Sequence, residues 1–133
     1  MDCIYYDPVT SDTTANYYLN TTNNSITYDG EYIVITSKVT GTEHLVDLRG
    51  LTDTLKGKIV NVEFEVDTNG MTGLMLRTLN LSPNVAVNVS DGVNTLENVV
   101  ITSDASGIIF RLIKTNSTSG QSFKFKNVKV YPV

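Results

Sequence analysis

The sequence predicts an all-β protein, an antiparallel β-sandwich of the jelly-roll type. Three observations support this: short apolar runs recur along the chain, turn residues separate them, and no window carries a helical stripe of three turns. With 133 residues, 41% of them hydrophobic and 18% charged, the chain has the size and apolar content of one packed domain. We therefore predict a single module over residues 1–133, in which the N-terminal segment 1–24 is less regular.

The expected elements follow in chain order. One strand is expected near Ile4, with loops up to residue 25, because turn residues interrupt the tyrosines there. Residues 48–55 fit at most one short helical turn. The clearest strand covers residues 58–66, where strict apolar and polar alternation buries one face. Other runs rich in Ile, Val, Leu or Phe predict strands at 32–36, 45–48, 74–79, 85–89, 96–101 and 107–113.

The last strand is expected over residues 123–130. It starts with two phenylalanines on one face and continues with two valines in shifted phase, which predicts a β-bulge at Lys126–Asn127. Glycine-containing turns separate most of the runs, as at Asp29–Gly30 and Asp91–Gly92. Many short strands without alternating helices favour a sandwich or barrel over a parallel α/β sheet.

Charge and composition exclude several classes of partner. The net charge of −4 and the isoelectric point near 4.8 argue against binding nucleic acid or anionic lipid. No apolar run approaches the roughly 20 residues that span a bilayer, so we expect no membrane insertion. The start Met1-Asp2-Cys3 does not resemble a signal peptide. Cys3 is the only cysteine, so no disulfide can form within the chain.

Catalytic patterns are weak. Glu63 and Glu65 share one face of the predicted strand, roughly 7 Å apart, which is close to the carboxylate separation in glycosidases. A solvated strand face explains them better, with Lys124 and Lys126 as cross-strand partners. His44, the only histidine, is expected at the surface. Phosphate-binding glycine motifs and a nucleophile elbow are absent, and one histidine with one cysteine cannot form a usual zinc site, so we expect no catalytic residue, cofactor or metal.

Four residues stand out as candidates for ligand binding. Tyr17 and Tyr18 are adjacent on an extended segment, so their side chains point in opposite directions and at least one should be exposed for stacking on a sugar ring. Arg77 and Arg111 lie inside otherwise apolar strands, where a guanidinium must reach solvent, a carboxylate or a ligand hydroxyl. Pairing with Glu63 or Glu65 is the expected structural role of the arginines, and ligand binding is the alternative.

Four segments, residues 25–36, 55–66, 107–112 and 123–131, resemble the jelly-roll carbohydrate-binding modules and the related modules on phage and archaeal-virus tail or surface proteins. In such modules the second segment is a Leu-x-Gly-Lys corner leading into the core, and the last closes the sheet. The chain departs from that pattern in two ways. It has no Trp for the binding face, and Lys126 occupies the position of an Asp that holds structural calcium, so bound calcium is not expected.

The resemblance implies a noncatalytic module for adhesion or glycan recognition on a virion tail or cell-surface protein, located on a virion or outside the cell. Its partner would be a glycan or cell-surface polysaccharide. One alternative is a structural or assembly domain that contacts copies of itself or virion proteins. Exposed aromatic residues around one groove would favour recognition, and an unblocked edge strand would favour assembly. A small jelly-roll glycosidase acting through Glu63 and Glu65 is the second alternative.

Overall fold

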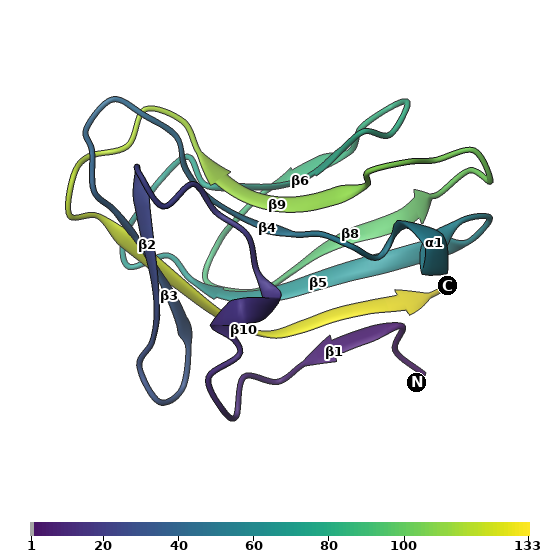
Figure 1. Ribbon diagram of the computed structural model, residues 1–133, viewed down its shortest axis with the longest axis horizontal. Coiled ribbons are helices and arrows are strands. Elements are labelled where there is room, and N and C mark those ends of the chain that lie inside the picture. The colour runs from purple at the N-terminus through teal and green to yellow at the C-terminus, as the bar shows by residue number, and fades with distance from the viewer. Residues whose placement is uncertain (1) are drawn as a thin grey trace.

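Two antiparallel sheets form the molecule, as a computed structural model shows for residues 2–133 (Figure 1). The six strands of sheet A are β1 (Tyr5–Asp7), β2 (Asn24–Tyr28), β3 (Ile33–Ser37), β5 (Ile59–Asp67), β8 (Gly92–Val100) and β10 (Ser122–Pro132). The four strands of sheet B are β4 (His44–Leu48), β6 (Met75–Leu79), β7 (Ala86–Asn88) and β9 (Ile109–Lys114). The helical turns are η1 (Thr14–Asn16) and α1 (Thr52–Leu55). This confirms the predicted β-sandwich.

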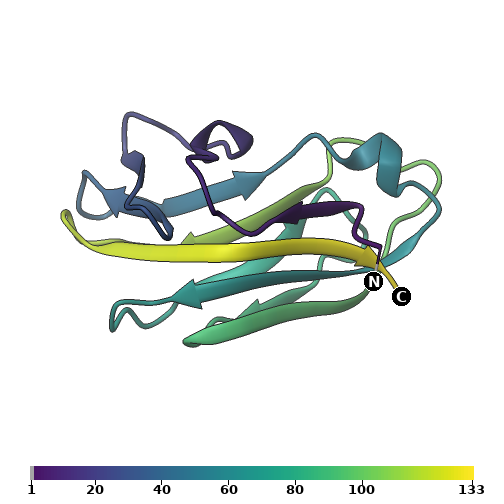
Figure 2. The ribbon, with the colours of Figure 1, turned by 90° about the horizontal axis from the view of Figure 1, so that it is seen from below.

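Sheet A has the order β2-β3-β10-β5-β8, and β1 also pairs with β10. Strands β3 and β1 share one edge of β10, because Ser122–Phe125 pair with β3 and Val128–Val130 pair with β1. Figure 2 shows the yellow β10 beside the teal β5 and the green β8 in one layer. Sheet B has the order β4-β9-β6-β7. None of the helices among residues 2–133 has the length and apolarity to cross a bilayer.

The core lies between the two sheets and follows the sequence alternation. In β5 the residues Val60, Val62, Phe64 and Val66 are buried while their neighbours are partly exposed. The ring of Phe64 packs against that of Phe125, with their centroids 5.5 Å apart. Burial of these apolar side chains is the main driving force for joining the sheets.

The predicted β-bulge in β10 is confirmed. The register of β10 against β5 shifts between Lys126 and Lys129, and Asn127 adopts the left-handed conformation with φ of 48°. Asparagine tolerates this conformation better than most residues do. The extra residue at the bulge shifts the alternation of β10. Phe123 and Phe125 before the bulge and Val128 and Val130 after it therefore all face the core.

Two expectations on local structure were wrong. The segment from Asn24 to Tyr28 is a strand that pairs with β3, although no strand was expected between the one near Ile4 and residue 32. Its alternation is weak because it lies at the edge of sheet A. His44 is fully buried, not at the surface: its Nε2 is 2.9 Å from the carbonyl oxygen of Ile35, and its ring packs on Phe123. The module boundary, predicted as 1–133, stays a prediction, and Met1 lies outside the described residues.

Candidate functional site

A row of side chains crosses the outer face of sheet B. Backbone register places Tyr18 opposite Asp47, Asp47 opposite Arg111, and Arg111 opposite Arg77. Arg77 in turn lies opposite Ala86 of β7. Residues opposite one another in antiparallel strands point to the same face. The core-facing positions of these strands are occupied by other residues, such as Leu76 and Leu112, so the row points away from the core. We call these four residues, Tyr18, Asp47, Arg111 and Arg77, the sheet B row.

Asp47 is the electrostatic centre of the row. Its carboxylate is fully buried and accepts two hydrogen bonds from Arg111, from Nε to Oδ1 at 2.6 Å and from Nη2 to Oδ2 at 2.9 Å. Arg49 donates to Oδ2 from Nε at 3.0 Å and from Nη2 at 2.7 Å. The hydrogen bonds to Asp47 raise the pKa of Arg111 above its ordinary value. Two guanidinium groups therefore compensate one buried carboxylate and are held rigidly by it.

Tyr18 is held at the free edge of β4. Its backbone N–H donates to Asp47 O at 2.9 Å, and its carbonyl accepts from the Asp47 N–H at 2.8 Å. The side chain is 50% exposed, and the Arg49 guanidinium carbon lies 3.7 Å from the centre of its ring. A cavity of about 560 Å³ opens beside this residue, lined by parts of residues 14–21 and by Ile26. The ring is thus a fixed, half-exposed aromatic surface bordering a hollow.

Arg77 differs from the other two arginines. It is half-buried, and its Nε donates to the carbonyl oxygen of Thr78 at 3.3 Å. Within residues 2–133 no carboxylate forms an ion pair with Arg77, whereas Arg49 and Arg111 both pair with Asp47. The forked end of the Arg77 side chain is therefore available to a ligand.

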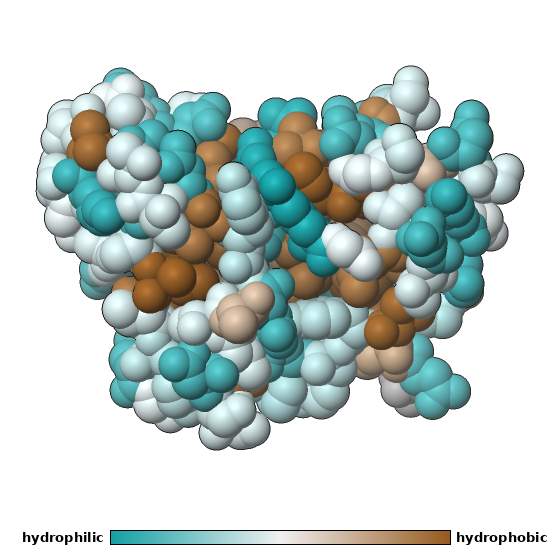
Figure 3. All heavy atoms as spheres, in the orientation of Figure 1, coloured by the Kyte–Doolittle hydropathy of each residue, from teal (hydrophilic) through white to brown (hydrophobic). Residues whose placement is uncertain are grey.

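Apolar side chains border the row on the same face. On one side the register aligns Leu45, Ile113 and Met75, and on the other it aligns Ile109 with Leu79. Leu45 and Ile113 are nearly buried but lie outside the core cluster between the sheets. Figure 3 shows hydrophobic surface on both sides of a strongly hydrophilic strip, over the region where Figure 1 places β4 and β9. This apolar surrounding strengthens electrostatic contacts made by the row.

The adjacent tyrosines point in opposite directions, as the extended segment predicted. Tyr17 is only 7% exposed, and its hydroxyl donates to Asp7 Oδ2 at 2.7 Å. Its ring packs edge-on against Phe125. Burial, followed by the bonds to Tyr5 and Asp7, raises the pKa of Tyr17 above its ordinary value. Tyr17 therefore anchors the N-terminal segment to the core, while Tyr18 is the member of the pair that a ligand can reach.

The expected pairing of Arg77 and Arg111 with Glu63 or Glu65 was wrong. The glutamates lie on β5 in sheet A, and Arg111 finds its carboxylate, Asp47, on the neighbouring strand of sheet B instead. The predicted cross-strand pairing of Glu63 and Glu65 with Lys124 and Lys126 is confirmed for Lys126, whose Nζ lies 3.8 Å from Glu65 Oε2. It was wrong for Lys124, which lies opposite Asp67. Lys126 also donates to Glu31 Oε1 at 2.9 Å.

Asp47 and Arg49 were not singled out from the sequence as members of a site. Asp47 interrupts the apolar run Leu45 to Leu48 in the same way that Arg77 and Arg111 interrupt theirs. Such a charge inside a buried strand requires a partner, so the same reasoning could have found it. Arg49 carries no such signal, because it follows the strand and precedes a glycine turn.

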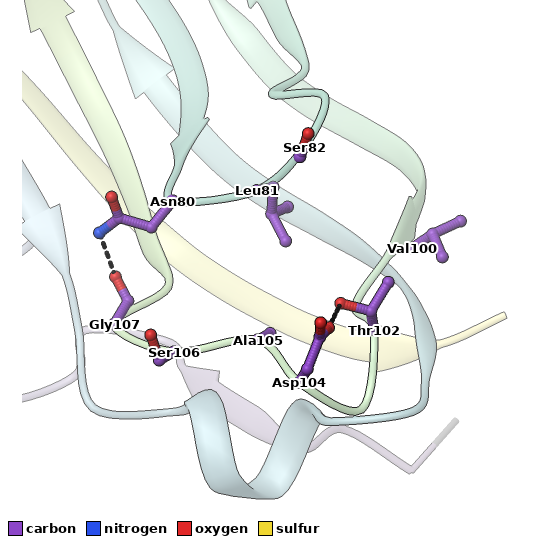
Figure 4. Close-up of a pocket in the computed structure, with 9 residues that line it drawn as sticks. All are labelled: Asn80, Leu81, Ser82, Val100, Thr102, Asp104, Ala105, Ser106 and Gly107. Carbon is purple, nitrogen blue, oxygen red and sulfur yellow. Dashed lines mark hydrogen bonds between the residues drawn. The ribbon is translucent and has the colours of Figure 1, made fainter.

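A second hollow lies at one end of the sandwich, between the β6–β7 and β8–β9 connections (Figure 4). Leu81 points into the space between the connections. Asn80 donates to the Gly107 carbonyl at 2.6 Å, and the Thr102 hydroxyl donates to Asp104 at 2.6 Å. Neither an aromatic ring nor a cation lines this hollow, so it offers less binding chemistry than the sheet B row. Residues 2–133 contain no group of three or more His, Cys, Asp or Glu side chains placed to hold a metal.

Several solved structures resemble the chain. The xylan-binding CBM22-1 domain of Paenibacillus barcinonensis Xyn10C superposes with a TM-score of 0.67 and 12% identity, covering 99% of this chain and 95% of that domain. The CBM22-1 and GH10 modules of Clostridium thermocellum Xyn10B, solved with xylohexaose, give a TM-score of 0.67 and 13% identity. The match covers all of this chain and 29% of that structure.

A third similar structure is TmCBM27, a carbohydrate-binding module studied for specific mannan recognition, with a TM-score of 0.56 and 9% identity. It covers 99% of this chain and 98% of that module. No protein-family model and no curated protein matches the chain. The fold is thus that of jelly-roll carbohydrate-binding modules. The phage or archaeal-virus part of the resemblance stays a prediction.

Proposed function

We propose that this protein is a noncatalytic glycan-recognition module that binds its ligand on the outer face of sheet B. The observation that carries the proposal is the sheet B row, in which a half-exposed tyrosine and two arginines align across neighbouring strands. With strands about 4.8 Å apart, the row from Tyr18 to Arg77 extends about 14 Å. An extended surface of this kind suits a chain of sugar residues.

The chemistry of the row suits sugars. The face of Tyr18 offers an apolar surface for the C–H groups of a pyranose ring, while guanidinium N–H groups donate to sugar hydroxyls. The bonds of Arg111 to Asp47 fix its orientation before a ligand arrives, which reduces the entropy lost on binding. The fold shared with xylan-binding and mannan-binding modules supports the same function.

The placement of the carboxylates fits hydrolysis of a glycan less well than it fits glycan binding. A glycosidase needs two carboxyl groups facing one sugar, one of them able to donate a proton. The carboxylate of the sheet B row, Asp47, is fully buried and bonded to two arginines, so it cannot exchange protons with a substrate. Glu65 lies beside Lys126 and accepts from Asn127 at 3.3 Å, and Glu63 lies opposite Lys129. The placement of the carboxylates therefore supports the proposal of a noncatalytic module.

A glycan array with the purified protein tests the proposal, with Tyr18→Ala beside Tyr6→Ala. Tyr6 is the matched control because it is 54% exposed but lies opposite Lys129 on sheet A. We expect binding to at least one polysaccharide, weakened about tenfold or more by Tyr18→Ala, because an aromatic contact is lost, and unchanged by Tyr6→Ala. Silence across the array, or equal loss with both variants, would refute the proposal.

Self-association is a second candidate function, favoured by one observation. Val93 and Val100 on the edge strand β8 are 62% and 58% exposed, and Ile59, opposite Val100, is 48% exposed. Exposed apolar residues along a sheet edge favour contact with another chain. Sedimentation measurements at increasing concentration would then show a dimer or larger species that Val100→Lys dissociates. A monomer at all concentrations would remove this candidate. The virion or cell-surface location stays a prediction.

A further inference from the structure

We propose, on the basis of the glycan-recognition function above, that the sheet B row selects acidic glycans and that Arg77 binds the carboxylate of a uronic acid residue. The chain has a net charge of −4, yet all three of its arginines, Arg49, Arg77 and Arg111, gather at this one face. Such a concentration of cations in an acidic protein needs an explanation.

The carboxylates present do not balance these cations. Asp47 is bonded to both Arg49 and Arg111. The other carboxylate that acts on Arg111 is that of Glu43, which is exposed and directly precedes β4. Three guanidinium groups thus face one buried and one solvent-exposed carboxylate. The face retains positive charge, and an anionic ligand would neutralise it.

The position of Arg77 strengthens this argument. It lies directly opposite Arg111, and like charges in opposite positions of a sheet destabilise each other. Arg111 is compensated by Asp47, but Arg77 forms no ion pair within residues 2–133. A carboxylate bound at Arg77 would relieve the repulsion that the folded protein otherwise carries.

The surroundings of Arg77 favour a carboxylate of the ligand over a ligand hydroxyl. Met75 and Leu79 precede and follow Arg77 on the same face of β6, and both are half-buried. Apolar neighbours reduce screening by water, so a charge-assisted bond gains more than a neutral one does. The planar fork of a guanidinium matches the two oxygens of a carboxylate, as Arg111 already demonstrates with Asp47.

The test compares uronate polysaccharides with their own carboxyl-reduced forms. Glucuronoxylan, polygalacturonate and alginate are each measured by affinity electrophoresis before and after reduction. We expect the wild-type protein to bind at least one uronate form about tenfold more tightly than its reduced form, which is the usual gain from a charge-assisted hydrogen bond. Arg77→Gln should remove this preference, and Arg77→Lys should keep only part of it, because an ammonium lacks the planar fork.

Lys129→Gln is the matched control, since it removes the same charge from the outer face of sheet A. It should leave the preference intact. Equal affinity for native and reduced polymers would overturn the inference while leaving glycan recognition in place, whereas no binding to either form would overturn both. Dextran sulfate is the third arm. Tighter binding to it than to any uronate, lost equally with Arg77→Gln and Lys129→Gln, would indicate attraction to any polyanion and overturn the inference.

Discussion

At the scale of single residues, Asp47 connects the fold to the candidate site. Its carboxylate is fully buried, yet its side chain belongs to the outer face of sheet B and holds Arg49 and Arg111 in place. A buried carboxylate is stable only when its charge is compensated and its oxygens accept hydrogen bonds. Arg49 and Arg111 meet both requirements. Because Asp47 already holds their side chains, they lose less conformational freedom when a ligand binds.

We predict that Asp47→Asn lowers the free energy of unfolding by about 2–4 kcal/mol, because it leaves Arg111 without its charged partner. Urea denaturation followed by circular dichroism measures the change. Asp53→Asn is the control, since Asp53 is 97% exposed and its ion pair with Lys56 spans 3.4 Å. That variant should unfold like the wild type. A similar small effect for both variants would show that Asp47 does not hold the arginines as described.

His44 predicts a dependence of stability on pH. Burial lowers the pKa of this histidine below its ordinary value of 6.5, which the bond to Ile35 offsets only in part. The folded state then binds a proton less readily than the unfolded state does. The contribution of neutral His44 to the free energy of unfolding is therefore fully present above pH 6.5. It is lost as the pH falls from 6.5 toward the lower pKa that His44 has in the folded protein.

His44 is the only histidine, so its ring signals in proton NMR can be assigned without ambiguity. They should titrate below pH 6.5 in the folded protein, and urea midpoints should fall between pH 7 and pH 5. His44→Leu lacks the titrating group and should lose that slope, whatever its absolute stability. A folded-state titration at or above 6.5 would contradict this explanation.

At the scale of elements, the sequence predicted strands well where alternation was strict. The strand predicted at 58–66 corresponds to β5 (Ile59–Asp67), and the short helical turn expected within 48–55 is α1. Strand β2 was missed because Asn24–Tyr28 is an edge strand with a mixed pattern of burial. Edge strands bury less apolar surface, so tertiary pairing with β3, not alternation, determines their structure.

The bulge in β10 predicts that substitutions of Asn127 by valine and by glycine differ in their effect on stability. Asn127 has φ of 48°, a conformation that costs a β-branched residue about 1–2 kcal/mol. Both Asn127→Val and Asn127→Gly lose the hydrogen bond to Glu65, so Asn127→Val should lower the free energy of unfolding by about 1–2 kcal/mol more than Asn127→Gly does. Lys129→Val, beyond the bulge on the same strand, should show no comparable loss. Chemical denaturation of the three variants checks this, and equal losses with valine and glycine would contradict it.

At the scale of the whole molecule, topology creates the candidate site. Tyr18, Asp47, Arg77 and Arg111 are far apart in sequence and become one row only through the pairings β4-β9-β6 and the bridge at Tyr18. The sequence indicated three of these residues from local features: an adjacent tyrosine pair and charges inside apolar strands. It could not indicate which sheet each strand joins, and that is why the arginines were first paired with glutamates of the other sheet.

The most direct test of the central claim is amide chemical-shift mapping of the labelled protein, titrated with the oligosaccharide that binds most tightly on the array. We predict that the largest shifts fall on Tyr18, Asp47, Arg77 and Arg111, on the outer face of sheet B. Shifts centred on sheet A around Tyr6 and Lys129, or on the hollow at Leu81, would contradict the proposed site and place recognition elsewhere on the fold.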